Sequence, residues 1–178
     1  ANTDLIVNAD CDDINLRNRL ERTFQVFDND PSIEVFYANC IINNLDTGEK
    51  KLRWFQPFNG ELLKQINYIP NSSSAFRKSS YLNKTKGYDR GVFIGEDYDL
   101  WLQFLFAGAK FAFLEEEVAE ISIHSTSTRG SFPQKQKDDL AKIKVEAQKK
   151  GMPLTKDSVV HFTVHSLNSG QFYVRLID

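Results

Sequence analysis

The segment Leu5-Ile6-Val7-Asn8-Ala9-Asp10-Cys11-Asp12-Asp13 joins an apolar run directly to three carboxylates. The apolar run is typical of a strand buried on both faces of a sheet. Clustered carboxylates repel one another and lose hydration when buried, so a cation would stabilise them. Ligands of open α/β sheets bind beyond the carboxyl ends of the strands. The segment therefore predicts an α/β fold with a magnesium or manganese site at one strand end.

Outward from this segment, strand-like and helix-like patterns alternate along the chain. Apolar residues at helical spacing, among them Leu16, Leu20, Phe24 and Phe27, predict the first helix. Helices are expected at residues 16–27, 61–66, 78–84, 97–107 and 133–150. Strands are expected at residues 5–10, 33–43, 51–55, 75–77, 111–114 and 117–123, with a terminal hairpin at 159–164 and 171–177. This order predicts a mixed sheet flanked by helices.

A second acidic group, Glu96, Asp97 and Asp99, opens the most apolar helix of the chain. The apolar face that follows must be buried, which draws the first acids of the helix toward the edge of the core. A carboxylate held there can act as a general base. The first acidic group is Asp10, Asp12 and Asp13.

Each acidic group also has a purely structural explanation. Asp13 or Asn15 could cap the helix that follows the first group. The second group could only complement the dipole of its helix. Both explanations are open from sequence alone.

The composition excludes several classes of partner. The chain has 178 residues, 41% of them hydrophobic, and a formal net charge of −2. This charge balance excludes nucleic acid as a partner, because a basic surface is missing. The two cysteines, Cys11 and Cys40, favour a reducing compartment. No apolar run reaches membrane-spanning length.

Three stretches resemble, in order, segments of the family 2 glycosyltransferases, which are nucleotide-sugar enzymes with the GT-A fold. Asp10-Cys11-Asp12-Asp13-Ile14, followed by Asn18-Arg19-Leu20, resembles the family's DxD segment. Gly87-Tyr88-Asp89, followed by Glu96-Asp97-Tyr98-Asp99-Leu100-Trp101, resembles the segment that contains the catalytic base. His124 with Ser125 resembles a third, later segment. The resemblance covers roughly residues 3–150.

The resemblance implies a donor site at the first acidic group. Asp12 would ligate a divalent metal, Mn²⁺ or Mg²⁺, that bridges the diphosphate of the donor. Asp10 would assist or contact the ribose or the sugar, and Asp13 would contact the donor or orient the loop. His124 would be a further ligand of the metal or a diphosphate contact; its structural alternative is a surface imidazole.

The resemblance also implies the reaction. Asp97 would deprotonate the acceptor hydroxyl, with Glu96 as the alternative base. The donor would be a nucleotide-diphosphate sugar such as a UDP-sugar, and the acceptor a glycan or a lipid-linked sugar. Attack from the face opposite the leaving group predicts an inverting transferase. The implied location is the cytoplasm, with peripheral association at the inner face of the membrane.

The resemblance begins at the strand that leads into the DxD segment. We therefore expect a carboxyl-terminal portion that lacks the strands holding the nucleotide base. Alone, it would transfer sugar poorly or not at all. Residues 1–150 would form the partial catalytic domain and residues 151–178 a β-hairpin extension that follows Gly151-Met152-Pro153.

Two alternatives stand beside the transferase. In the first, the acids and polar loops form a non-catalytic module that binds carbohydrate or a divalent metal. In the second, the terminal hairpin pairs two copies of the chain into a homodimer through its edge strand.

Overall fold

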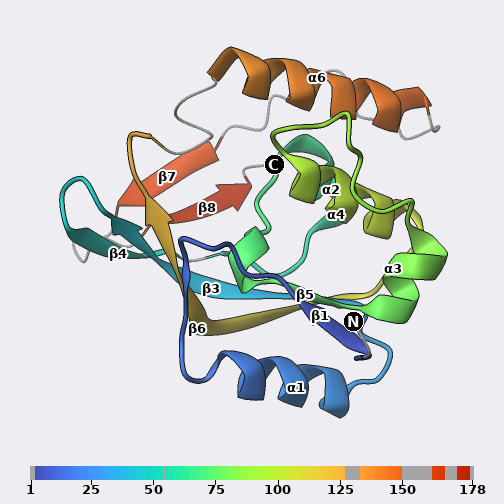
Figure 1. The fold of residues 1–178 in the computed structure, drawn as a ribbon, viewed down its shortest axis with the longest axis horizontal. Helices are drawn as coiled ribbons and strands as arrows, with labels where there is room; N and C mark the ends of the chain where they lie inside the picture. Colours follow the sequence, from blue (N-terminus) through green and yellow to red (C-terminus); the bar gives the residue numbers. More distant parts are fainter. Residues whose placement is uncertain (1–2, 54, 127–132, 150–161, 167–171, 177–178) are drawn as a thin grey trace.

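The computed structural model describes residues 3–53, 55–126, 133–149, 162–166 and 172–176. Its main sheet has six strands of mixed direction, with helices on both faces (Figure 1). The order is β1, β5, β3, β6, β2, and β4 pairs with the second half of β3. The strands are β1 (Leu5–Val7), β2 (Ile14–Asn15), β3 (Val35–Asn44), β4 (Glu49–Arg53), β5 (Ala75–Arg77) and β6 (Phe111–Ile123). The predicted mixed α/β architecture is confirmed, while its GT-A assignment stays a prediction.

The helices lie close to the predicted positions. They are α1 (Arg19–Asn29), α2 (Gly60–Gln65), α3 (Lys78–Lys84), α4 (Glu96–Phe106) and α6 (Pro133–Lys149), with a 3₁₀ turn η1 (Asn71–Ser73). At the end of α4, Gly108 adopts φ +68°, which glycine tolerates without the steric cost of a side chain. Among the described residues, no helix is both long enough and apolar enough to cross a membrane.

The centre of the sheet is the parallel pair β3 and β6. The sequence predicts two separate strands at residues 111–114 and 117–123, but the structure has one strand with a bulged stretch that contains two adjacent register shifts. Ala38 of β3 pairs with Leu114, whereas its neighbour Asn39 pairs with Glu117. The ladder to β3 continues on both sides of this shift, so the acidic run bends β6 without ending it.

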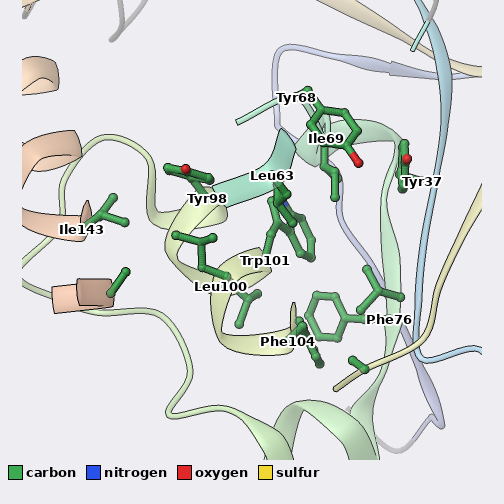
Figure 2. Close-up of a cluster of buried hydrophobic side chains, with 14 of the residues drawn as sticks. Tyr37, Leu63, Tyr68, Ile69, Phe76, Tyr98, Leu100, Trp101, Phe104 and Ile143 are labelled. Atoms are coloured by element: carbon green, nitrogen blue, oxygen red, sulfur yellow. The ribbon is translucent and has the colours of Figure 1, made fainter. Parts of the chain in front are cut away.

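Two apolar cores lie on opposite faces of the sheet. In the larger one, α2 and α4 pack against the sheet, and α6 packs against α4 from the other side (Figure 2). Trp101 and Phe104 of α4 are fully buried there and contact Phe76 of β5. The smaller core packs Phe27 of α1 against Phe36 of β3. The apolar face of α4 thus attaches the helix to the sheet.

The buried face of α1 differs from the predicted one. Arg19, Thr23 and Phe27 are buried, whereas Leu20 and Phe24 are exposed. The predicted helix is confirmed, but the face that packs on the sheet includes Arg19, which donates hydrogen bonds to backbone carbonyls. This correction matters for the site, because Arg19 lies beneath the first acidic group.

Beyond residue 149, the structure describes two paired segments. β7 (Phe162–Ser166) and β8 (Phe172–Leu176) pair antiparallel; β7 overlaps the expected strand 159–164 in part, and β8 lies within the expected strand 171–177. The turn expected to join them, Asn168-Ser169-Gly170, and the expected boundary at Gly151-Met152-Pro153 lie outside the described residues. The hairpin extension, the division at residue 150 and the homodimer stay predictions.

Candidate functional site

The first acidic group follows β1 in a tight turn, closed by a hydrogen bond from the Asp13 amide to the Asp10 carbonyl (3.2 Å). Both carboxylate oxygens of Asp10 accept hydrogen bonds from the segment around η1. Asn71 Nδ2 donates to Oδ1 at 3.0 Å, and Ser72 Oγ donates to Oδ2 at 2.7 Å. Asp10 is therefore held in place by side chains more than sixty residues away along the chain.

Asp13 points toward the sheet. Its carboxylate accepts the backbone N–H of Ser122 on β6 at 2.8 Å. Burial raises the pKa of Asp13, and the charges of its two neighbouring aspartates raise it further, against the hydrogen bonds that lower it. The capping alternative is wrong for this group: Asn15 lies in β2, and Asn18 begins α1 without a side-chain cap.

Asp12 and His124 face each other. His124 directly follows β6, and its Nε2 lies 3.8 Å from Asp12 Oδ2. The Asp12 side chain is 50% exposed and the His124 side chain 27%. Thr126 Oγ1 lies 2.9 Å from the other ring nitrogen, Nδ1. The structure thus brings together two residues that are far apart in sequence and leaves both accessible.

The second acidic group begins α4. Gly95 adopts φ +92° just before the helix, a conformation that residues with a side chain rarely adopt. Glu96 is exposed, whereas Asp97 is half-buried and accepts a hydrogen bond from Asn67 Nδ2 to Oδ2 at 3.0 Å. Tyr98, the next residue, is packed into the core.

The segment that leads into β5 touches both acidic groups. Asn67 contacts Asp97, and Asn71, four residues later, contacts Asp10. Four residues span at most about 14 Å even when fully extended. The two acidic groups therefore lie on the same side of the molecule, at the two ends of one short segment.

Tyr88 lies near the second acidic group. Burial raises the pKa of its hydroxyl to about 12, and the nearby carboxylates of Asp97 and Glu96 raise it too. On the side of the first acidic group, Asn8 Nδ2 donates to Asn71 Oδ1 at 3.0 Å and to Ser74 Oγ at 2.9 Å.

Arg19 connects the backbone segments that carry the first acidic group and its partners. Its Nη2 donates to the backbone carbonyls of Asn8 and Ser74, both at 2.9 Å. Burial lowers the pKa of the guanidinium to about 10. The buried arginine therefore ties the end of β1 to the segment that leads into β5.

The chemistry of the first acidic group fits a divalent cation in part. Within the described ranges, no cluster of three or more histidine, cysteine or acidic side chains is close enough to hold a metal. Asp12 and His124 would supply one oxygen and one nitrogen ligand, a set that suits Mn²⁺ better than Mg²⁺. Asp10 and Asp13 are already engaged by protein donors. A cation held here would need further ligands from a bound diphosphate or water.

Comparison with known proteins gives one relevant similarity. No protein-family model matches the chain. Over 133 residues, it is 28% identical to a protein of Methanocaldococcus jannaschii named an uncharacterized glycosyltransferase. The aligned part covers 72% of this chain and 45% of that relative. This similarity agrees with the resemblance in the motifs, while family 2 membership and a missing amino-terminal portion stay predictions.

Sequence reasoning missed three residues of the site. Tyr88 had a usable signal, since it lies inside one of the motif stretches. Asn8 ends the apolar run as a lone polar residue, which also marks it. Asn67 lies in an ordinary polar loop, and nothing in the sequence links it to Asp97.

Proposed function

We propose that the chain carries the metal-binding and base-bearing part of a glycosyltransferase. It transfers a sugar from a nucleotide-diphosphate sugar, such as a UDP-sugar, to a glycan or lipid-linked acceptor with inversion. The observation that carries this proposal is the pair of contacts from one segment to Asp10 and Asp97. The similarity to a named glycosyltransferase supports the reaction class.

In this proposal the two acidic groups have separate tasks. Asp12 and His124 hold the divalent cation, which would neutralise charge on the departing diphosphate. Asp97 accepts the proton of the acceptor hydroxyl on a carboxylate oxygen, and Asn67 fixes the orientation of that carboxylate. Glu96, more exposed than Asp97, is the alternative base. Holding donor and acceptor together supplies much of the remaining rate.

Binding and turnover of variants test the proposal. Asp12→Asn and His124→Ala should each weaken Mn²⁺-dependent binding of UDP by about tenfold or more, as loss of a ligand does. Asp97→Asn should keep UDP binding but slow UDP release from UDP-sugars in the presence of acceptor glycosides by about 10²–10⁴-fold. Isothermal titration and a UDP-release assay measure the two effects, and even slow turnover suffices for the comparison.

Asp28→Asn, on the exposed side of α1, is the matched control and should change neither quantity. UDP binding that is indifferent to Mn²⁺, or to Asp12 and His124, would contradict the assigned metal site. Equal turnover of Asp97→Asn and the parent chain would exclude Asp97 as the base.

One observation favours the second candidate, a non-catalytic module that binds carbohydrate or a divalent metal. Asp10 and Asp13 are engaged by Asn71, Ser72 and Ser122, as structural carboxylates would be. Such a module would bind Mn²⁺ or sugar in the same titrations and release no UDP.

A further inference from the structure

Helix α6 lies against the loop before α4, residues 89–95 (Figure 1). Its Asp139 is buried, and one carboxylate oxygen, Oδ2, accepts the backbone N–H groups of both Phe93 and Ile94, at 2.9 and 3.0 Å. The other oxygen, Oδ1, accepts a hydrogen bond from Lys135 Nζ at 2.7 Å. A buried carboxylate is costly unless it is hydrogen-bonded, so these contacts explain how Asp139 can be buried.

The same helix packs directly on Gly95, the last residue before α4. Gly95 adopts φ +92°, and a Cβ atom at this position would lie 3.3 Å from Leu140 Cδ2 and 3.4 Å from Ile143 Cδ1. Further back in the loop, Lys142 Nζ donates to the Gly91 carbonyl at 2.8 Å. Side chains of α6 therefore hold the loop along its length, up to the residue at which α4 begins.

The first turn of α4 connects this loop to the candidate base. The Gly95 carbonyl accepts the backbone N–H of Asp99 at 3.0 Å. Asp97 Oδ1 accepts the backbone N–H of Tyr98 at 2.8 Å, and Asp97 Oδ2 accepts a hydrogen bond from Asn67. The orientation of the Asp97 carboxylate thus depends on the backbone of this turn on one side and on Asn67 on the other.

We propose that Asp139 is a positioning residue for Asp97. It holds the amides of residues 93 and 94, these residues lead into Gly95, and Gly95 begins the turn that bears the carboxylate. The inference rests on the proposed transferase function and adds α6 to the parts of the chain on which the reaction depends. A general base acts only within hydrogen-bond reach of its proton, and a displacement of about 1 Å can cost about 10²-fold in rate.

The side-chain amide of Asn67 reports the position of Asp97 without any turnover, because it donates to that carboxylate. In ¹H–¹⁵N spectra of the labelled chain, Asp139→Ala should shift this signal, which Asn67→Ser identifies. Asp139→Asn should give the parent signal, since one amide oxygen can accept both N–H groups even though the ion pair with Lys135 is lost. A loss of stability alone lowers the folded fraction but does not move the signals of the folded chain.

Turnover provides the second measurement. In a UDP-release assay with a UDP-sugar and acceptor glycosides, Asp139→Ala should lower kcat by up to about 10²-fold. Mn²⁺-dependent binding of UDP should stay as in the parent chain, and Asp139→Asn should restore kcat. Asp138→Asn, one residue earlier and exposed, is the matched control and should change neither kcat nor the Asn67 signal.

If Asp139→Ala fails to fold, Leu140→Ala replaces it, because it removes a contact with Gly95 at a half-buried position. Its matched control is Val145→Ala, at an exposed position of α6. The proposal is overturned if the Asn67 signal of the folded alanine variant is that of the parent, or if Asp139→Asn shifts it equally. Failure of the transferase proposal is read separately, as a parent chain that releases no UDP, and the Asn67 signal still tests the coupling of α6 to Asp97.

Discussion

At the scale of single residues, the coupling between Tyr88 and Asp97 is directly measurable. The Asp97 carboxylate is one cause of the raised pKa of Tyr88, after burial. Asp97→Asn should therefore lower that pKa from about 12, while burial keeps it above the ordinary value of 10. Glu96→Gln should lower it by less. Absorbance titration of the tyrosines, with Tyr88→Phe to assign the signal, measures the change.

The same shift has a consequence for stability. The folded chain retains the Tyr88 proton between pH 10 and about 12, where the unfolded chain loses it. Stability contributed by this residue thus falls as the pH rises through that window. Asp28→Asn should leave the titration unchanged. An unchanged Tyr88 pKa in Asp97→Asn would show that the two side chains do not interact.

At the residue scale, the sequence reveals clustered carboxylates but not contacts between residues that are distant along the chain. The acidic groups stand out in the sequence because carboxylates cluster there. The contact of Asn67 with Asp97 spans 30 residues, and that of Asn8 with Asn71 spans 63. Only the folded chain defines such pairs, because an asparagine in a loop has no distinctive pattern.

At the scale of elements, α6 is held to the loop that precedes α4 by Asp139. Its buried carboxylate accepts the backbone N–H groups of Phe93 and Ile94 at 2.9 and 3.0 Å. The Lys135 ammonium, 2.7 Å away, lowers the pKa of Asp139 most, and the two N–H groups lower it further. Asp139 thus holds in place the residues that lead into α4, which begins at Glu96.

Asp139 predicts a pH dependence of stability. Because its pKa is depressed in the folded state, its contribution is present above the unfolded value of 3.8 and lost as the pH falls through the folded pKa. Asp139→Asn should destabilise the chain at neutral pH, and the difference from the parent should shrink in acid. Denaturant unfolding at several pH values measures it.

Asp139→Ala should in addition speed hydrogen exchange at the amides of Phe93 and Ile94, since their acceptor is gone. Asp138→Asn, one residue earlier and exposed, is the control. A constant difference between Asp139→Asn and the parent from neutral to acid pH would contradict the assigned role.

Element prediction was exact for the short elements β5 and α3. α4 and β3 were found within one or two residues, because their apolar residues favour one arrangement. For α1 the helix was predicted but its buried face was not. Arg19 is buried because it donates hydrogen bonds to the carbonyls of Asn8 and Ser74, and the spacing of apolar residues does not reveal such bonds. The bulge in β6 was missed because an acidic run resembles the end of a strand.

At the scale of the whole molecule, the larger core joins three helices to the sheet, and α4 is its centre. Leu100→Ala, at a fully buried position, should lower the free energy of unfolding by about 2–5 kcal/mol. The matched change Leu82→Ala, at a residue 64% exposed on α3, should cost less than about 0.5 kcal/mol. Thermal or denaturant unfolding compares them, and equal losses would contradict the described packing.

The bulge in β6 has a consequence for how this chain tolerates insertions and deletions. Side chains alternate along a strand, so removing one residue between Leu114 and Val118 would either reverse every later side chain or shift the pairing with β3. Ser122, which holds Asp13, and His124, which faces Asp12, both lie past that point. Insertions or deletions at this bend should therefore disturb the first acidic group more strongly than single substitutions there.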